Sequence, residues 1–191
     1  PTREPLDPVR YISNHSSGKM GYALASAALE AGATVTLISG PVAIAAPDKV
    51  SLVAVETAQQ MHAAAIQHAA ECDLFIAAAA VADYRPADIA EQKMKKQSDN
   101  LTIALVKNPD IVAAVTMQYP QLTAVGFAAE TEQVEQYARG KLASKGLTAI
   151  VANNVSRSDI GFNSDENEVT VYTADTSQVF TKRGKGQLAR D

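Results

Sequence analysis

The stretch LTAVGFAAETEQVEQYARGKLASKGLTAIVANNV, residues 122–155, contains two apolar runs separated by one amphipathic run. Residues 122–130 and 148–155 are rich in small and β-branched apolar side chains, as expected for buried strands. Residues 133–146 between them are typical of a helix that is ended by glycine. A strand, a helix and a second strand of these lengths form a unit whose strands run parallel. This stretch therefore predicts an α/β fold.

The same alternation extends toward the N-terminus. The predicted helices cover residues 20–31, 58–71 and 110–119, and the predicted strands cover residues 34–41, 49–57, 74–81 and 101–107. Near-continuous apolar strands separated by helices predict a mostly parallel, doubly wound sheet. Residues 167–182 instead alternate in the manner of a β-hairpin, with the turn near Asp175 and Thr176. We therefore expect one domain with a C-terminal antiparallel hairpin appendage over residues 156–185.

Composition places the chain among ordinary globular proteins. The sequence has 191 residues, of which 47% are hydrophobic and 20% charged, and its net charge is −4. These values fit a single domain with a sizeable core and provide no overall basic surface for nucleic acid. No apolar run reaches the roughly 20 residues that span a bilayer, and no signal peptide is visible. We therefore expect a cytoplasmic protein with no nucleic-acid or membrane partner.

Cys72 is the single cysteine of the sequence. One cysteine excludes an internal disulfide and offers no metal-binding cluster. Because Cys72 lies in a helix-like run, we expect a buried structural thiol and not a nucleophile. The three histidines show no metal-binding or triad spacing. An enzyme with this sequence would therefore act by binding, positioning and charge neutralisation.

The glycine-containing segment ISNHSSGKMGYALASAALEAG, residues 12–32, leads into the first predicted helix. A Walker loop requires Ser or Thr after its lysine, but methionine follows the lysine here. A dinucleotide loop requires G-x-G-x-x-G after a strand and an acid after the next strand, and neither is present. The segment is therefore an anion site at a helix start, near Ser16 and Gly18, or an ordinary serine cap. Gly18 and Gly21 weaken a helix start, which favours the anion site.

Ligands of parallel sheets bind beyond the carboxyl ends of the strands, so residues that follow the predicted strands are candidates. Asp83 follows one strand, where the small side chains of Ala79 and Ala80 would let a ligand approach the backbone. Tight packing beside a solvated Asp83 is an equal alternative. Residues 91–97, EQKMKKQ, place three lysines in a long polar stretch between strands. They form either a solvated face or a flexible arm that closes on polyphosphate.

Three further candidates follow later strands. Residues 108–110, Asn-Pro-Asp, are typical of a helix start, which offers either a second anion site or ordinary capping. Phe127 falls at a strand end, where it would stack on a base or belong to the core. Lys141 and Lys145 are four residues apart and share one helix face.

Several longer motifs occur in an order that resembles one family. They are PTREPLDPVRYISNHSSGKMG, AAAVADYRP, the lysines of EQKMKKQ, KNPDIV, VGFAAET, and ANNVS with GFNSDENE. The sequence resembles phosphopantothenoylcysteine synthetase, and more closely the synthetase half of bacterial bifunctional decarboxylase–ligase chains. The resemblance implies a Rossmann-like homodimer that joins 4′-phosphopantothenate to the amine of L-cysteine. It also implies CTP as co-substrate with Mg²⁺, an acyl-cytidylate intermediate with loss of pyrophosphate, and displacement of CMP by cysteine.

The resemblance implies roles for individual residues. Asn14 corresponds to an asparagine that contacts the reacting acyl group, and Lys93 to the lysine of a flap that meets the triphosphate, so these two are the expected catalytic residues. The expected substrate-binding residues are Arg10, Ala79, Ala80 and Asp83. The expected nucleotide-binding residues are Ser16, Gly18, Gly21, Asp83, Lys93, Pro109, Asp110, Ile111, Val112, Phe127, Lys141 and Lys145. The motifs identify no Mg²⁺ ligand.

The sequence departs from the family's pattern at its ends. The family has a strand and a glycine-rich turn ahead of the residues that match 1–3, and these are absent from the sequence, as is the decarboxylase half. The C-terminal helix is also shorter. We therefore expect the natural chain to be longer and to carry a decarboxylase domain, and residues 156–185 to form a dimerisation arm.

Two other functions stay open from the sequence. A non-catalytic nucleotide- or flavin-binding module would keep the anion site but would need neither Asn14 nor the lysine flap. A short-chain dehydrogenase requires a Tyr-x-x-x-Lys pair, which Tyr137 and Lys141 supply by spacing. The absence of a dinucleotide loop and of a ribose-binding acid argues against the dehydrogenase.

Overall fold

The computed structural model describes residues 1–96, 99–156 and 164–191. Its largest sheet has five strands in the order β11-β10-β9-β8-β5. Three of them run parallel to one another, namely β5 (Leu74–Ala77), β8 (Thr123–Glu130) and β9 (Ala149–Asn154). Helix α4 (Val134–Ser144) joins β8 to β9. The predicted parallel strand–helix–strand unit is therefore confirmed.

The C-terminal hairpin extends this sheet. It consists of β10 (Glu166–Tyr172) and β11 (Ser177–Gly184), which pair antiparallel, and β10 also pairs antiparallel with β9. The turn lies between Tyr172 and Ser177, where the Thr173 N–H donates to the Thr176 carbonyl oxygen at 3.0 Å. The predicted hairpin and its turn are confirmed, and the hairpin forms one continuous sheet with the parallel strands.

The two earlier predicted strands form a small parallel sheet of their own, β3 (Thr36–Ser39) with β4 (Ser51–Ala54). The first residues of the chain connect it to the larger sheet. The Arg3 N–H donates to the Glu56 carbonyl oxygen beyond β4, and the Thr2 N–H donates to the Ala80 carbonyl oxygen beyond β5. The chain start therefore lies where the carboxyl ends of the two sheets meet.

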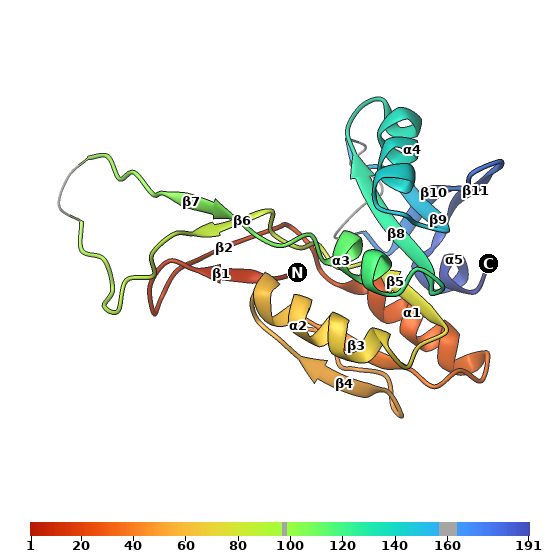
Figure 1. The fold of residues 1–191 in the computed structure, drawn as a ribbon, viewed down its shortest axis with the longest axis horizontal. Helices are drawn as coiled ribbons and strands as arrows, with labels where there is room; N and C mark the ends of the chain where they lie inside the picture. The colour runs from red at the N-terminus through yellow and green to blue at the C-terminus, as the bar shows by residue number, and fades with distance from the viewer. Residues whose placement is uncertain (97–98, 157–163) are drawn as a thin grey trace.

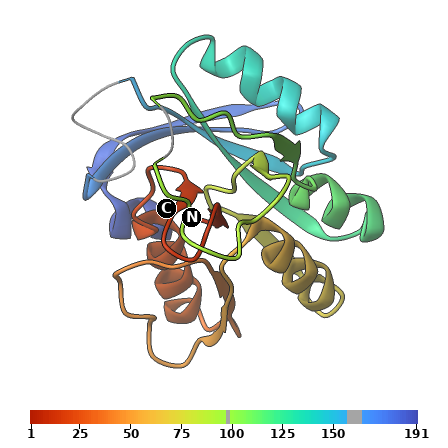
Figure 2. The ribbon, with the colours of Figure 1, turned by 90° about the vertical axis from the view of Figure 1, so that its left-hand side faces the viewer.

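Helices cover both faces of the large sheet (Figure 2). On one face α4 packs through Ala138 and Leu142 against Ala128, Ile150 and other small or apolar side chains of the sheet. On the opposite face lie α1 (Lys19–Glu30) and the C-terminal α5 (Lys185–Arg190), which contact each other. This arrangement confirms the mostly parallel, doubly wound α/β fold.

A second core forms between α2 (Ala58–Ala69) and α3 (Ile111–Gln118). Local sequence fixes where both helices begin. The Thr57 hydroxyl accepts from the Gln60 N–H at 3.2 Å, and the Gln60 side chain accepts from the Thr57 N–H at 3.1 Å, which makes a capping box for α2. The Asp110 carboxylate accepts from the Ala113 N–H at 3.1 Å and caps α3.

Four short strands form an arm that projects from the body (Figure 1). They make two antiparallel pairs, β1 (Arg3–Pro5) with β2 (Tyr11–Ser13), and β6 (Tyr84–Pro86) with β7 (Leu105–Lys107). The sequence did not predict β1, β2 or β6, and of the predicted strand 101–107 only the last three residues form one. Strands of three residues that contain proline carry too little periodicity to be recognised.

Two other predictions concern the burial of Cys72 and membrane-spanning helices. Cys72 is exposed, which corrects the prediction of a buried thiol, and its Sγ donates to the His68 carbonyl oxygen at 3.1 Å. Partial burial, with the acidic neighbours Asp73 and Glu71, raises the pKa of the Cys72 thiol, so it is a poor nucleophile at neutral pH. Within the described ranges, no helix has the length and apolar character to cross a membrane.

Candidate active site

Two glycines bring the first turn of α1 against the carboxyl ends of β3 and β5. A Cβ atom added to Gly18 would lie 2.8 Å from Cγ1 of Val42, in the segment after β3. A Cβ atom added to Gly21 would lie 3.8 Å from Cβ of Ala78, just beyond β5. The predicted anion loop and the predicted substrate segment near Ala79 are therefore neighbours, although they are distant in sequence.

Helix α1 begins without a serine cap. Its N-cap residue is Gly18, with a φ of 79°, and no described side chain caps the helix. The Ser16 hydroxyl accepts a long bond of 3.4 Å from the Gly18 N–H, and the Ser17 hydroxyl accepts one of 3.5 Å from the Lys19 N–H. The alternative of an ordinary serine cap is therefore wrong. Asn14 is exposed in the segment that leads into α1.

Gly18→Ala should destabilise the protein by about 2–4 kcal/mol, because alanine is strained at positive φ and its Cβ would collide with the stiff Val42 side chain. Gly140→Ala is the matched control. A Cβ at Gly140 meets no atom within 4 Å, and alanine in helix α4 should stabilise by about 0.5–1 kcal/mol. Urea unfolding of both variants measures the difference, and equal midpoints would contradict the close approach at Gly18.

The buried Asn108 fixes the segment that follows β5. Its N–H donates to the Asp83 carbonyl oxygen at 2.8 Å, and its Nδ2 donates to the Ala82 carbonyl oxygen at 2.8 Å. Its Oδ1 accepts from Nη1 of Arg85 at 3.2 Å. These bonds hold the exposed Asp83 beside Pro109, at the start of α3. The sequence indicated Asn108 only as a helix cap, a role that Asp110 performs.

The two predicted lysines of α4 point toward acids at the same edge of the fold. Nζ of Lys145 lies 3.2 Å from Oδ2 of Asp110, and Nζ of Lys141 lies 2.6 Å from Oε1 of Glu130 at the end of β8. Burial raises the pKa of Asp110, but its bond from the Ala113 N–H and its contact with Lys145 outweigh this, so its pKa lies below the usual value. The structure therefore joins Lys145 to the start of α3.

Phe127 lies apart from these lysines. On β8 the alternate residues Gly126 and Ala128 face α4, since a Cβ at Gly126 would lie 2.7 Å from Leu147 and Ala128 packs with the α4 core. Side chains alternate along a strand, so Phe127 faces the other side of the sheet. The structure does not bring Phe127 onto the face that carries Lys141 and Lys145.

Arg10 and Lys93 both lie on the arm. Nε of Arg10 donates to Asp7 Oδ2 at 2.9 Å, and Nη2 of Arg10 donates to the Met94 carbonyl oxygen at 2.8 Å. The adjacent Lys93 is exposed and forms no hydrogen bond or ion pair with the described residues. The structure thus groups Arg10 with the lysine segment, and it does not bring Lys93 onto the first turn of α1.

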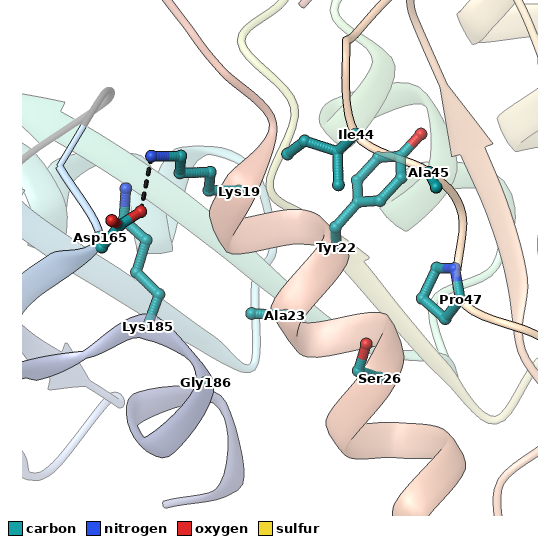
Figure 3. A pocket seen from close by; sticks show the side chains of 10 residues that line it. All are labelled: Lys19, Tyr22, Ala23, Ser26, Ile44, Ala45, Pro47, Asp165, Lys185 and Gly186. Atoms are coloured by element: carbon teal, nitrogen blue, oxygen red, sulfur yellow. Dashed lines mark hydrogen bonds and ion pairs between the residues drawn. The ribbon is translucent and has the colours of Figure 1, made fainter.

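A hollow of about 480 Å³ lies on the flank of α1, beside the predicted site (Figure 3). Its charged lining comes from Lys19, Asp165 and Lys185, with Tyr22 and Ser26 on the helix. Nζ of Lys19 lies 2.6 Å from Oδ1 of Asp165. Burial, and then the charge of Lys19, lower the pKa of Lys185. Sequence reasoning missed these residues because the lysines are far apart in the chain.

The full chain, residues 1–191, matches the family model described as the DNA/pantothenate metabolism flavoprotein C-terminal domain. The chain belongs to this family. It is 53% identical over 194 residues to the coenzyme A biosynthesis bifunctional protein CoaBC of Vibrio vulnificus strain CMCP6, a match that covers 100% of the chain and 48% of that protein. It is 52% identical over 198 residues to CoaBC of Escherichia coli strain K12, covering 100% of the chain and 49% of that protein.

A solved structure has the same fold as this chain. The crystal structure of the C-terminal domain of CoaBC superposes with a TM-score of 0.84 at 41% identity, covering 100% of this chain and 86% of that chain. The predicted family resemblance and the predicted Rossmann-like fold are therefore confirmed. The chain spans about half the length of the CoaBC relatives it matches.

Family membership leaves the roles of single residues as predictions. At the carboxyl edge the structure brings together Gly18, Gly21, the segment 79–83 and the start of α3. No three His, Cys, Asp or Glu side chains gather into a metal site within residues 1–96, 99–156 and 164–191.

Proposed function

We propose that the chain is the phosphopantothenate–cysteine ligase domain of a coenzyme A biosynthesis enzyme. The observation that carries this proposal is the match of the whole chain to CoaBC relatives at 52–53% identity. The geometry supports it, because the first turn of α1, the exposed Asp83 and the capped start of α3 meet at one edge. The first turn of α1, which no side chain caps, suits an anionic group of a ligand at this edge.

In the first proposed step, the carboxylate of 4′-phosphopantothenate attacks the α-phosphorus of CTP. A new acyl–phosphate bond forms, the bond to the β-phosphate breaks, and pyrophosphate leaves. Both reactants are anions, so positive charge must offset their repulsion. In this proposal Lys93 supplies it at the triphosphate, the N–H groups of the first turn of α1 bind phosphate, and Lys145 lies near the start of α3.

In the second proposed step, the amine of L-cysteine attacks the acyl carbon, CMP leaves with the bonding electrons, and the amine loses a proton. Negative charge develops on the acyl oxygen during this attack. Asn14 is exposed in the segment that leads into α1, and in this proposal its side-chain N–H₂ donates to that oxygen. Closure of the lysine segment over the anhydride would exclude water and favour cysteine over hydrolysis.

A bound Mg²⁺ would offset the negative charge of the triphosphate. Asp83 is the described carboxylate best placed to contact the ion, because Asp110 is already paired with Lys145. The preference for CTP over other triphosphates rests on the family resemblance.

Mass spectrometry tests the ligase directly. The protein is incubated with Mg²⁺, CTP and 4′-phosphopantothenate without cysteine, and then cysteine is added. The expected result is an acyl-cytidylate that converts to 4′-phosphopantothenoylcysteine with release of CMP. A folded protein that binds CTP but forms neither species would instead be a nucleotide-binding module.

We also propose that the natural chain is longer and carries a decarboxylase domain, because the CoaBC relatives are called bifunctional and have about twice the length. The family resemblance further implies a strand ahead of residue 1. Such a strand would cover the edge of β5, where Leu74 is half exposed and no described strand pairs.

We propose that the protein is a homodimer and that the arm carries the contact. Eight of the exposed large apolar side chains lie on the arm and its loops, namely Val9, Tyr11, Tyr84, Ile89, Leu101, Ile103, Leu105 and Val106. On the hairpin β10–β11, which the sequence favoured as the dimer arm, only Val179 is in this class among the described residues. Apolar side chains on a projecting element are typical of an interface.

The variant Tyr84→Asp/Leu105→Asp should therefore elute at half the native mass in size-exclusion chromatography with light scattering, because it places charges in the apolar contact. Val179→Asp is the matched control and should leave the mass unchanged. The opposite pattern would assign the dimer contact to the hairpin, and two unchanged masses would exclude both surfaces.

A further inference from the structure

The turn between β1 and β2 binds the backbone of Met94 at both its N–H and its carbonyl oxygen. Oδ2 of Asp7 accepts from the Met94 N–H at 3.1 Å, and Nη2 of Arg10 donates to the Met94 carbonyl oxygen at 2.8 Å. The Ala90 N–H donates to the Leu6 carbonyl oxygen at 3.0 Å, so a second residue of the same segment is bound to the same turn. The side chains of Asp7 and Arg10 thus satisfy both backbone polar groups of Met94.

Hydrogen bonds within its own turn fix the carboxylate of Asp7 in position for this contact. Its side chain has 0% exposure, and its Oδ1 accepts from the N–H groups of Val9 at 2.8 Å and Arg10 at 2.9 Å. Its Oδ2 also accepts from Nε of Arg10 at 2.9 Å. The hydrogen-bonded Arg10 guanidinium is the main reason that the pKa of Asp7 lies well below its usual range. The carboxylate is therefore ionised throughout the physiological range of pH.

Met94 lies between Lys93 and Lys95, and both lysines are exposed. A residue fixed at both its N–H and its carbonyl oxygen restricts the backbone on either side, and it thereby limits where the two ammonium groups can reach. The position of the lysines depends on a carboxylate that belongs to another hairpin.

We propose that Asp7 is a positioning residue that, together with Arg10, fixes Met94 and so sets the position of Lys93. The role in catalysis rests on the proposed ligase function, in which Lys93 meets the triphosphate. The fixing of the segment is a property of the fold and can be tested without any substrate.

Cleavage by a lysine-specific protease provides the test of the fold. Asp7→Asn loses the negative charge and one acceptor oxygen, so the segment should open more often, and cleavage after Lys93 and Lys95 should accelerate at least about tenfold. Glu135→Gln is the matched control, since it removes an exposed carboxylate that pairs with Arg139 on α4. The control should leave both cleavage rates unchanged.

A second variant removes the backbone donor of the same contact. Met94→Pro removes the N–H that donates to Asp7 and leaves the pair of Asp7 and Arg10 intact. Proline blocks cleavage after the preceding Lys93, so the rate is read at Lys95, where it should again rise at least about tenfold. Unchanged cleavage at Lys95 in both variants would overturn the proposal. Equal acceleration at all lysines in both would also overturn it, because the effect would then be global unfolding.

A double-mutant cycle tests the role in catalysis. Asp7→Asn should lower kcat about tenfold to a hundredfold, because the lysine is displaced. The variant Asp7→Asn/Lys93→Gln should be no slower than Lys93→Gln, because Asp7 acts through Lys93. Additive losses would refute positioning, even if the protease result stands. If the unmodified protein lacks ligase activity, the proposed function fails, and the protease result still decides whether Asp7 fixes the segment.

Discussion

Lys93→Gln should lower the rate of acyl-cytidylate formation about a hundredfold or more, while CTP affinity changes much less. Glutamine keeps the length and most of the hydrogen-bonding capacity of the side chain but removes its charge. That charge is needed most when the anionic carboxylate approaches the α-phosphate, so its loss acts on the transition state more than on binding. Single-turnover measurements without cysteine, together with calorimetric titration of CTP, separate the two effects.

Lys49→Gln is the control for this experiment. Lys49 is also exposed, but it lies in the segment before β4. Its replacement should leave both the rate and the affinity unchanged. Equal turnover in the Lys93→Gln and unmodified proteins would remove Lys93 from the catalytic residues and leave the lysine segment as a solvated face.

Asn14→Asp and Asn14→Ala should each lower the rate of 4′-phosphopantothenoylcysteine formation about 10²–10³-fold, because both lack the N–H₂ group proposed to donate to the acyl oxygen. A carboxylate at this position would also repel the developing negative charge, so the aspartate variant should be the slower of the two. Addition of cysteine to preformed acyl-cytidylate isolates this step, and quenched samples give its rate.

His15→Gln is the neighbouring control, since His15 is exposed in the same turn and has no proposed role in the reaction. Its rate should stay close to that of the unmodified protein. If Asn14→Ala proceeds at the native rate, the charge on the acyl oxygen must be stabilised by other donors, and the first turn of α1 would be the next candidate.

The layers of the fold followed from local sequence. Residues 122–155 predicted the β8-α4-β9 unit because an eight-residue strand and an eleven-residue helix each carry a clear period. The arm could not be predicted in the same way. Strand β6 is only three residues long and is stabilised by pairing with β7, where Pro86 lies opposite Leu105. Pairing between segments this distant is decided by tertiary packing, which no local pattern records.

The candidate site also contains some residues that the sequence could identify and others that it could not. The glycines at 18 and 21 were recognisable because glycine is costly in a helix start and so indicates a close approach. Asp110 was recognisable because its cap bond spans three residues. The contacts of Asp7 with Met94 and of Asn108 with Ala82 join residues that are 87 and 26 positions apart. These side chains have no signature that would distinguish them from other polar residues near turns.

Helix α1, which carries the predicted anion loop, is held at both ends by the end of the chain. Lys19 in its first turn pairs with Asp165, and its last residue Glu30 pairs with Arg190 through two bonds of 2.7 and 3.0 Å. The buried Leu188 lies in α5, which packs along α1. During synthesis on the ribosome, α1 is therefore complete long before the residues that secure it emerge. The emergence of residues 165–190 from the exit tunnel therefore determines when α1 becomes fixed.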